Sequence, residues 1–225
     1  MKGLLMLLRV MSKNIGLILG SVMTIIIFSQ LAEAFTWTEV EDAGDLPGTA
    51  QNITNDGPLE FITGSLTSPT DVDMYAIFIT GDGNFSATTV GWTTDVDTQL
   101  TLFDSSGIGV YSNDDFTTNT RQSTLPALDP LTPIKPGLYY LAISDWDYDP
   151  VSDGGYIFPH PNNIISYTAV DGPTGPGGGS PITGWDGIAI SGGGSYTIAL
   201  TGAAASSHLP ERVNLPGVLL LLLGD

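Results

Sequence analysis

The chain has 225 residues, with 24 aspartates and glutamates against six lysines and arginines, and a formal net charge of -18 at pH 7. This length suits one β-sandwich of ordinary size and is short for two independent cores. Because nucleic acid and anionic lipid heads are bound through clustered Lys and Arg, the acid excess argues against both as partners. The absence of cysteine excludes disulfides, thiol catalysis and Cys-type zinc sites.

The N-terminus has the pattern of a targeting segment. Basic residues precede an apolar run over residues 15–28, and Ala32-Glu33-Ala34 then supplies the small-x-small pattern of a signal peptidase site. We expect residues 1–34 to be a helical signal peptide that is removed after Ala34. The protein would then be exported, as a secreted or cell-surface protein of the outer envelope. The alternative is a retained membrane anchor, for which the apolar run is short.

From residue 36 onward, short β-branched and aromatic runs alternate with Gly, Asp, Asn, Ser and Pro, and no amphipathic helical pattern of useful length appears. The sequence therefore predicts an all-β fold, a jelly-roll-like antiparallel β-sandwich. Residues 74–79 are nearly all apolar, which predicts a central strand covered on both faces. Gly81-Asp82-Gly83 then predicts a hairpin turn. Strands are expected near residues 59–66, 74–80, 84–91, 99–103, 107–112, 138–144 and 195–201.

Residues 146–193 have a different composition, dominated by Gly, Pro, Asp and Asn. A segment of this kind buries little apolar surface to offset its ordering entropy, so the sequence predicts a long loop or an insertion at this place. The loop would lie within a sandwich domain spanning residues 35–202.

The C-terminal residues 203–225 are predicted to be a linker and a short apolar tail. Six apolar residues, 218–223, are too few to span a bilayer. The tail resembles the start of a PEP-CTERM type sorting signal, in which a Pro-containing motif precedes a hydrophobic helix and a terminal Arg cluster. Here the helix is short and the Arg cluster is missing. A frayed apolar end or a truncated gene model is the alternative, and membrane contact is expected only through this tail or the signal segment.

Carboxylates gather in groups that suit calcium, a hard cation that takes six to eight oxygen ligands. Acids at alternate positions also suit a solvated strand edge or turn, so each group has two interpretations. With no disulfide and a large acid excess, we expect at least one structural calcium site. The groups lie at residues 39–45, 71–73, 95–97, 113–115 and 145–149.

Six segments of acidic, turn-forming and aromatic or aliphatic residues follow one another along the chain: Glu39–Glu41, Asp71–Ile77, Leu100–Gly107, Asn113–Asp115, Pro136–Ile143 and Gly194–Ile198. In this order they resemble the bacterial pre-peptidase C-terminal (PPC) domains. The resemblance covers about residues 39–202, apart from the Gly- and Pro-rich segment. It implies a jelly-roll-like sandwich, of a kind that is appended to secreted peptidases or found in exported surface proteins.

The resemblance also implies a place for calcium. In the related collagen-binding domains of bacterial collagenases, an acidic segment before the first core strand joins the acids that precede an aromatic strand. The matching ligand positions here are Glu39, Glu41, Asp71 and Asp73. Asp42-Ala43-Gly44-Asp45 stands where the family often has Asn-Asp. Asp104, Asp114 and Asp115 match a recurrent acid-turn pattern, for which turn stabilisation is the first interpretation and metal binding the second.

Trp146 and Tyr148, which are flanked by acids, are candidates for a sugar-binding platform; the alternative is that they cap the core. Neither H-E-x-x-H nor G-x-S-x-G occurs, and no catalytic residue is assigned. We therefore expect a non-catalytic exported domain, stabilised by calcium, that serves in cell-surface or extracellular-matrix attachment or in protein interaction. A polysaccharide-binding module is the alternative. A secreted carboxylate-dependent hydrolase is the least favoured hypothesis. It stays open because its two acids would be defined by their separation in space, which the sequence does not give.

Overall fold

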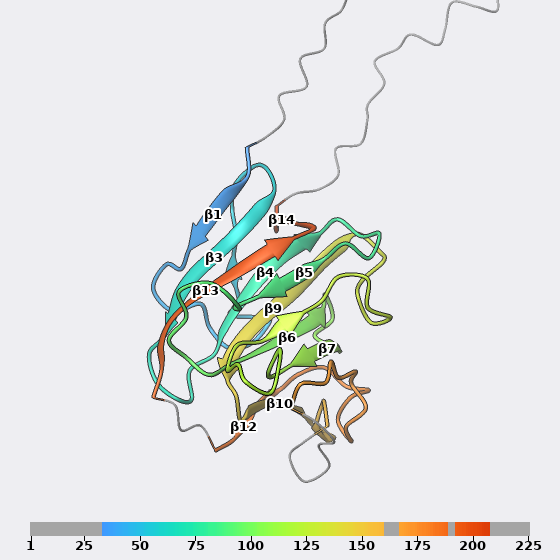
Figure 1. The fold of residues 1–225 in the computed structure, drawn as a ribbon. Coiled ribbons are helices and arrows are strands. Elements are labelled where there is room, and N and C mark those ends of the chain that lie inside the picture. Colours follow the sequence, from blue (N-terminus) through green and yellow to red (C-terminus); the bar gives the residue numbers. More distant parts are fainter. Residues whose placement is uncertain (1–32, 160–166, 189–191, 208–225) are drawn as a thin grey trace, which may run out of the picture. The chain divides into compact units, whose positions relative to one another are not determined.

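The computed structural model describes residues 33–159, 167–188 and 192–207. All helical or extended elements that the structure describes in these ranges are β-strands, and none is a helix. The predicted all-β class is therefore confirmed (Figure 1). No helix within these ranges is long and apolar enough to cross a membrane. The predicted signal segment up to residue 32 and the predicted sorting-type tail from residue 208 lie outside the described residues.

One sheet contains, in spatial order, β1 (Phe35–Thr38), β3 (Leu59–Leu66), β13 (Gly194–Thr201), β5 (Ser86–Thr88) and β8 (Thr124–Leu125). β1 and β3 are parallel, and the other neighbours are antiparallel. The longest pairing joins β3 to β13, from Leu66 opposite Gly194 to Phe61 opposite Ala199. The last described strand of this sheet along the chain therefore lies beside one of the first.

The second sheet contains, in spatial order, β14 (Ala203–Ala205), β4 (Asp73–Ile79), β9 (Gly137–Asp145), β6 (Thr98–Asp104) and β7 (Gly109–Asn113), with β2 (Gln51–Asn52) paired in parallel to β4. Asp73 lies opposite Ile143, and Thr98 lies opposite Asp145. The starts of β4 and β6 and the end of β9 therefore meet at one end of the sheet. The acid groups described below lie at this end.

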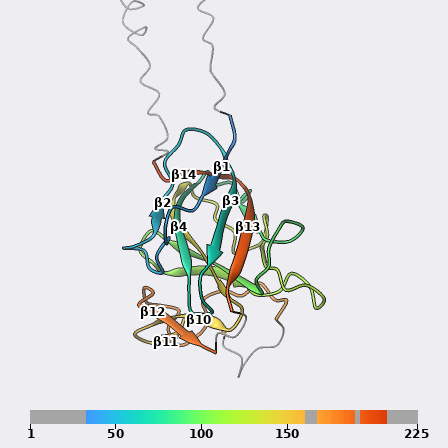
Figure 2. The same ribbon diagram turned by 90° about the vertical axis from the view of Figure 1, so that its left-hand side faces the viewer.

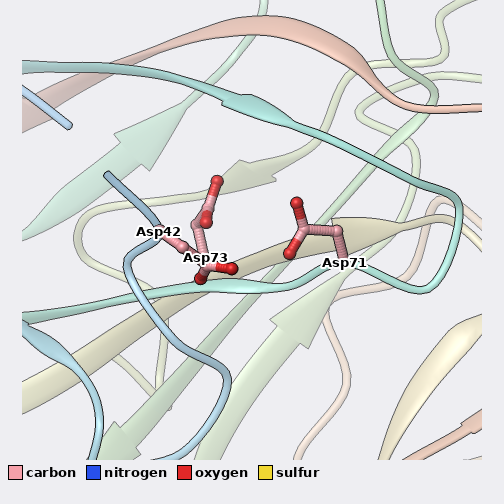
Figure 3. A group of neighbouring side chains, drawn as sticks. All are labelled: Asp42, Asp71 and Asp73. Carbon is pink, nitrogen blue, oxygen red and sulfur yellow. The ribbon is translucent and has the colours of Figure 1, made fainter. Parts of the chain in front are cut away.

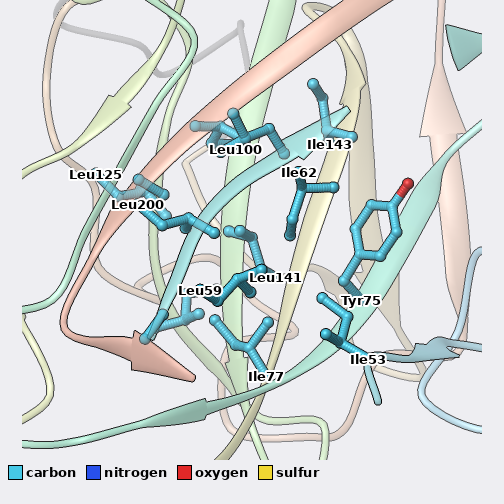
Figure 4. Close-up of a cluster of buried hydrophobic side chains, with 14 of the residues drawn as sticks. Ile53, Leu59, Ile62, Tyr75, Ile77, Leu100, Leu125, Leu141, Ile143 and Leu200 are labelled. Carbon is cyan, nitrogen blue, oxygen red and sulfur yellow. The ribbon is translucent and has the colours of Figure 1, made fainter. Parts of the chain in front are cut away.

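The two sheets enclose one apolar core (Figure 4). Because side chains alternate along a strand, every second residue of β4 points into it, as Tyr75 and Ile77 do. Ile62 comes from the facing sheet, and Leu141 and Ile143 come from β9. This arrangement is a sandwich-like packing of two sheets.

The seven strands expected from the sequence all form, as β3, β4, β5, β6, β7, β9 and β13, although β5 is shorter than expected. All seven residues of β4 are buried, which confirms a strand covered on both faces. The predicted hairpin at Gly81–Gly83 is wrong, because β4 and β5 lie in different sheets. This turn carries the chain from one sheet to the other, and its three residues have φ between 63° and 90°.

The predicted long loop or insertion at residues 146–193 contains a third sheet, with β10 (Tyr148–Ser152) between β11 (Gly155–Tyr156) and β12 (Gly184–Gly187). Figure 2 shows this sheet beyond the ends of β3, β4 and β13. Ile157, Phe158 and Ile182 pack on the outer face of the large sheet, where they form a second core with residues such as Met74 and Phe103. A few buried apolar side chains thus hold this Gly- and Pro-rich segment against the sandwich.

The prediction that a linker begins at residue 203 is wrong. Ala203–Ala205 form β14, are all buried and pair with β4, Ala203 opposite Ile79. A run of alanines has no alternation of apolar and polar residues that would predict a strand. Small side chains nevertheless fit where a strand packs closely against its neighbours. The sandwich therefore continues past the boundary expected from the sequence.

Candidate metal centre

Four carboxylates meet at the start of β4, and we call them the Asp73 cluster: Glu39, Asp42, Asp71 and Asp73. One carboxylate oxygen from each of Asp42, Asp71 and Asp73 lies within 4.8 Å of the other two (Figure 3). Glu39 is close enough for its charge to act on Asp73. The cluster therefore combines two segments of the chain, the one after β1 and the one that leads into β4.

The segment after β1 is held against β4 by its backbone. The amide of Met74 donates a 2.9 Å hydrogen bond to the carbonyl of Gly44, and the amide of Gly44 donates one of 2.8 Å to Oδ1 of Asp42. Gly44 has a φ of 65°, and a Cβ there would lie 2.7 Å from the Cβ of Thr49. Glycine at this position thus lets the tight turn bring Asp42 to the cluster.

Asp71 and Glu39 are each oriented by backbone amides. Oδ2 of Asp71 accepts hydrogen bonds from the amide and the hydroxyl of Thr67, at 2.5 and 2.7 Å. Oε2 of Glu39 accepts a 2.9 Å hydrogen bond from the amide of Ser65. A Cβ on the neighbouring Gly64 would lie 2.5 Å from Oε2 of Glu39, so glycine is needed there for the close approach. Both carboxylates are therefore held in position by hydrogen bonds from the chain itself.

Asp73 is the buried member of the cluster, with 0% of its surface exposed. Its Oδ2 accepts a 2.7 Å hydrogen bond from the hydroxyl of Tyr196, whose oxygen lies 2.5 Å from that of Tyr75. When Asp73 is ionised, the hydroxyl proton of Tyr196 is used in this hydrogen bond, so Tyr75 donates to Tyr196. Oδ1 of Asp73 is buried and accepts no hydrogen bond from any described residue.

Burial raises the pKa of Asp73 to about 8, although the Tyr196 hydrogen bond acts in the opposite direction. The neighbouring charges of Glu39 and Asp71 raise this pKa further. An ionised Asp73 with one oxygen lacking a donor is unfavourable in this environment, and either a proton or a cation would relieve it.

The other predicted ligands lie elsewhere. Glu41 is exposed and has a φ of 58°, which ends the strand-like alternation after Glu39, so that Asp42 joins the cluster in its place. Asp104 makes a turn, because its Oδ1 accepts hydrogen bonds from the amides of Ser106 at 2.8 Å and Ile108 at 3.1 Å. The geometry of Asp104 therefore matches the turn-stabilising interpretation.

Asp114 and Asp115 belong to a second group together with Asp97, and we call these three the Asp114 cluster. One carboxylate oxygen from each lies within 4.8 Å of the others. Burial raises the pKa of Asp97 to about 6 and that of Asp114 to about 8, and the charge of Asp115 raises both further. Sequence reasoning placed Asp97 in an acidic pair but had no means of bringing it to the two later acids, which follow a different strand.

Trp146 and Tyr148 point to different places. Trp146 lines a hollow of about 230 Å³ together with Tyr167 and the Asp114 cluster, and the two aromatic rings meet edge to face with centroids 6.3 Å apart. Tyr148 instead stacks on Trp185, with centroids 6.4 Å apart, where both pack on the second core. The platform interpretation suits Trp146, and the core-capping interpretation suits Tyr148.

Together, the fold and these residues define an acidic, sandwich-like all-β domain with two clusters of carboxylates at one end of its larger sheet. Comparison with protein-family models and with curated proteins found no match for the chain. The resemblance to pre-peptidase C-terminal domains therefore stays a prediction.

Proposed function

We propose that this protein is an exported, non-catalytic β-sandwich domain, stabilised by calcium, that serves in attachment at the cell surface or extracellular matrix or in protein interaction. One observation carries the proposal: fully buried Asp73 has an oxygen without a hydrogen-bond donor among three further carboxylates. The signal peptide at residues 1–34, the jelly-roll topology and the relation to PPC domains are parts of the same proposal.

The chemistry of the Asp73 cluster fits calcium. Calcium binds oxygen ligands at about 2.4 Å, so two oxygens on one ion lie no more than about 4.8 Å apart. The oxygens of Asp42, Asp71 and Asp73 meet this limit. All four side chains of the cluster offer hard carboxylate oxygens, and softer metals prefer sulfur or imidazole. Glu39, Asp42, Asp71 and Asp73 would hold the ion, which would supply positive charge where the buried oxygen lacks a donor.

Calcium would stabilise the fold through linkage. Asp42 reaches the cluster only when Gly44 docks on the start of β4, so the unfolded chain lacks the site. A ligand that binds only the folded form stabilises it by mass action. In a chain without disulfides, such an ion would tie the N-terminal segment to the sandwich and leave the surface loops to contact a partner.

The test is thermal unfolding of the purified full chain in calcium and in chelator. We expect a higher Tm in calcium for the wild type and for Asp104→Asn, which keeps an oxygen for its turn. Asp73→Asn should show a clearly smaller calcium-dependent shift. An equal shift in Asp73→Asn and wild type would overturn the proposal.

A polysaccharide-binding module is the second candidate function, and the hollow beside Trp146 is the observation that favours it. Aromatic faces in a concave, polar site suit sugars. Affinity electrophoresis of Trp146→Ala would test it, with Trp92→Ala as the matched control, because Trp92 is an exposed tryptophan that packs on Phe61 instead. A carboxylate-dependent hydrolase is the weaker proposal for this hollow, since three acid oxygens so close together suit one shared cation.

A further inference from the structure

The Asp114 cluster lies on rigid elements at one end of the larger sheet. Asp97 directly precedes β6, and Asp114 and Asp115 directly follow β7. β6 and β7 are antiparallel, with Leu100 opposite Asn113, which places the start of one beside the end of the other. Backbone hydrogen bonds fix these ends further, since the amide of Asp115 donates to the carbonyl of Tyr167 at 3.0 Å.

Two oxygens of this cluster have no donor. Oδ1 of Asp114 and Oδ1 of Asp115 are buried and accept no hydrogen bond in the described part of the chain. Nε of Arg121 lies 3.6 Å from Oδ2 of Asp97, but the Arg121 side chain is 80% exposed, and exposed ion pairs contribute little. The charge of Arg121 opposes the effect of burial on the pKa of Asp115, but Arg121 donates no hydrogen bond to either buried oxygen. Buried carboxylate oxygens are unfavourable without such a partner.

Gln99 supplies an independent observation. The residue is only 7% exposed, and its Nε2 donates a 2.9 Å hydrogen bond to Oδ1 of Asp149, which fixes the direction of the amide. The amide oxygen Oε1 is buried and has no donor. Gln99 and Asp114 line the same cavity of about 30 Å³, and about 10–15 Å³ is enough for one water-sized occupant. This cavity thus offers a neutral oxygen beside the acids and room for an ion or an ion-bound water.

We infer that Asp97, Asp114 and Asp115 form a second site for a hard divalent cation such as calcium, to which Gln99 Oε1 adds an oxygen from the adjoining cavity. All these donors are oxygens, which suits calcium. The hollow lined by the cluster, Trp146 and Tyr167 gives the cation a path from solvent. This site uses none of the residues of the Asp73 cluster.

Calcium binding to the full chain, measured by calorimetry or equilibrium dialysis, tests the inference. We expect two calcium ions per chain for the wild type and for Asp104→Asn, and one for Asp114→Asn. Asp115→Asn removes another ligand of the same site and serves if Asp114→Asn does not fold. Unchanged stoichiometry and affinity in a folded Asp114→Asn or Asp115→Asn variant would overturn the inference.

Terbium gives a second readout that a general loss of stability would not imitate. Terbium replaces calcium at oxygen sites and emits when a nearby tryptophan is excited. Because Trp146 lines the hollow, Trp146→Phe should reduce this emission while the number of bound calcium ions stays at two. Undiminished emission in Trp146→Phe would contradict an ion beside Trp146.

The same titrations distinguish failure of the second site from failure of the Asp73 cluster. Asp73→Asn should also bind one calcium, and the double variant Asp73→Asn/Asp114→Asn should bind none. Loss of an ion in Asp114→Asn alone would support the second site and overturn the proposed role of the Asp73 cluster. Loss in Asp73→Asn alone would do the reverse.

Discussion

The hydroxyl of Tyr196 donates a 2.7 Å hydrogen bond to Oδ2 of Asp73 and so joins β13 of one sheet to β4 of the other. It is the donor that the structure gives to this buried carboxylate, whose other oxygen has none. The contact couples the sheet-to-sheet packing to the Asp73 cluster. Substitutions in the cluster should therefore change the free energy of unfolding of the whole sandwich.

Tyr196→Phe should lower the free energy of unfolding of the metal-free protein by about 1–3 kcal/mol, because it removes that donor from a buried carboxylate. Urea unfolding in chelator measures this loss. Tyr139→Phe is the matched control, since its hydroxyl donates to the carbonyl of Lys135 at 3.2 Å in an exposed place. An equal loss in the two variants would contradict the role given to Tyr196.

Gly64→Ala should weaken calcium binding, because its Cβ would collide with Oε2 of Glu39 and with the Tyr196 hydroxyl, so that both would have to leave their positions at the cluster. Calcium titration of the folded variant measures the change in affinity, which we expect to be at least tenfold, or about 1.4 kcal/mol. Gly48→Ala is the control, because no atom lies within 4 Å of a Cβ there. Wild-type affinity in Gly64→Ala would exclude Glu39 as a ligand.

The metal-free protein should lose stability as the pH rises from about 4 to about 8. Burial raises the pKa of Asp73 and of Asp114, each to about 8 from an ordinary 3.8. In this window the folded chain keeps protons that the unfolded chain has released, so the stabilisation is complete below the unfolded pKa and is lost as the pH passes the folded one.

Tm values of the metal-free protein at about pH 5 and about pH 8.5 check this, and Asp73→Asn should show a smaller difference between them. Calcium should reverse the trend, because its ligands must be deprotonated, so the Tm gain from calcium should grow with pH. An equal pH dependence in Asp73→Asn and wild type would assign the effect to overall charge repulsion instead.

Ile157→Ala should destabilise the protein by about 2–5 kcal/mol, because Ile157 is fully buried in the second core. Ile188→Ala, at a position that is 70% exposed, should have little effect. Chemical denaturation compares the two. A negligible loss in Ile157→Ala would mean that the third sheet covers the sandwich without stabilising it.

The sequence by itself determined the β class and most of the central strands. Runs such as Met74–Ile79 are apolar on both faces, and the alternation of side chains along a strand is a local property that needs no partner to be recognised. The same local logic found the acid groups at the strand ends, including Asp71, Asp73, Asp114 and Asp115. It did not find Ala203–Ala205, because small residues carry no such alternation.

Only the tertiary structure decided which acids meet. Asp97 reaches Asp114 because β6 and β7 pair in one register, and Asp42 takes the place expected for Glu41 because a single positive φ turns the chain. The sequence also did not predict the contact between the rings of Trp146 and Tyr167, because Tyr167 lies in the segment predicted to be a loop or an insertion. Sheet pairing and turns bring together residues that are distant in the chain, and their side chains converge only when the whole sandwich has formed.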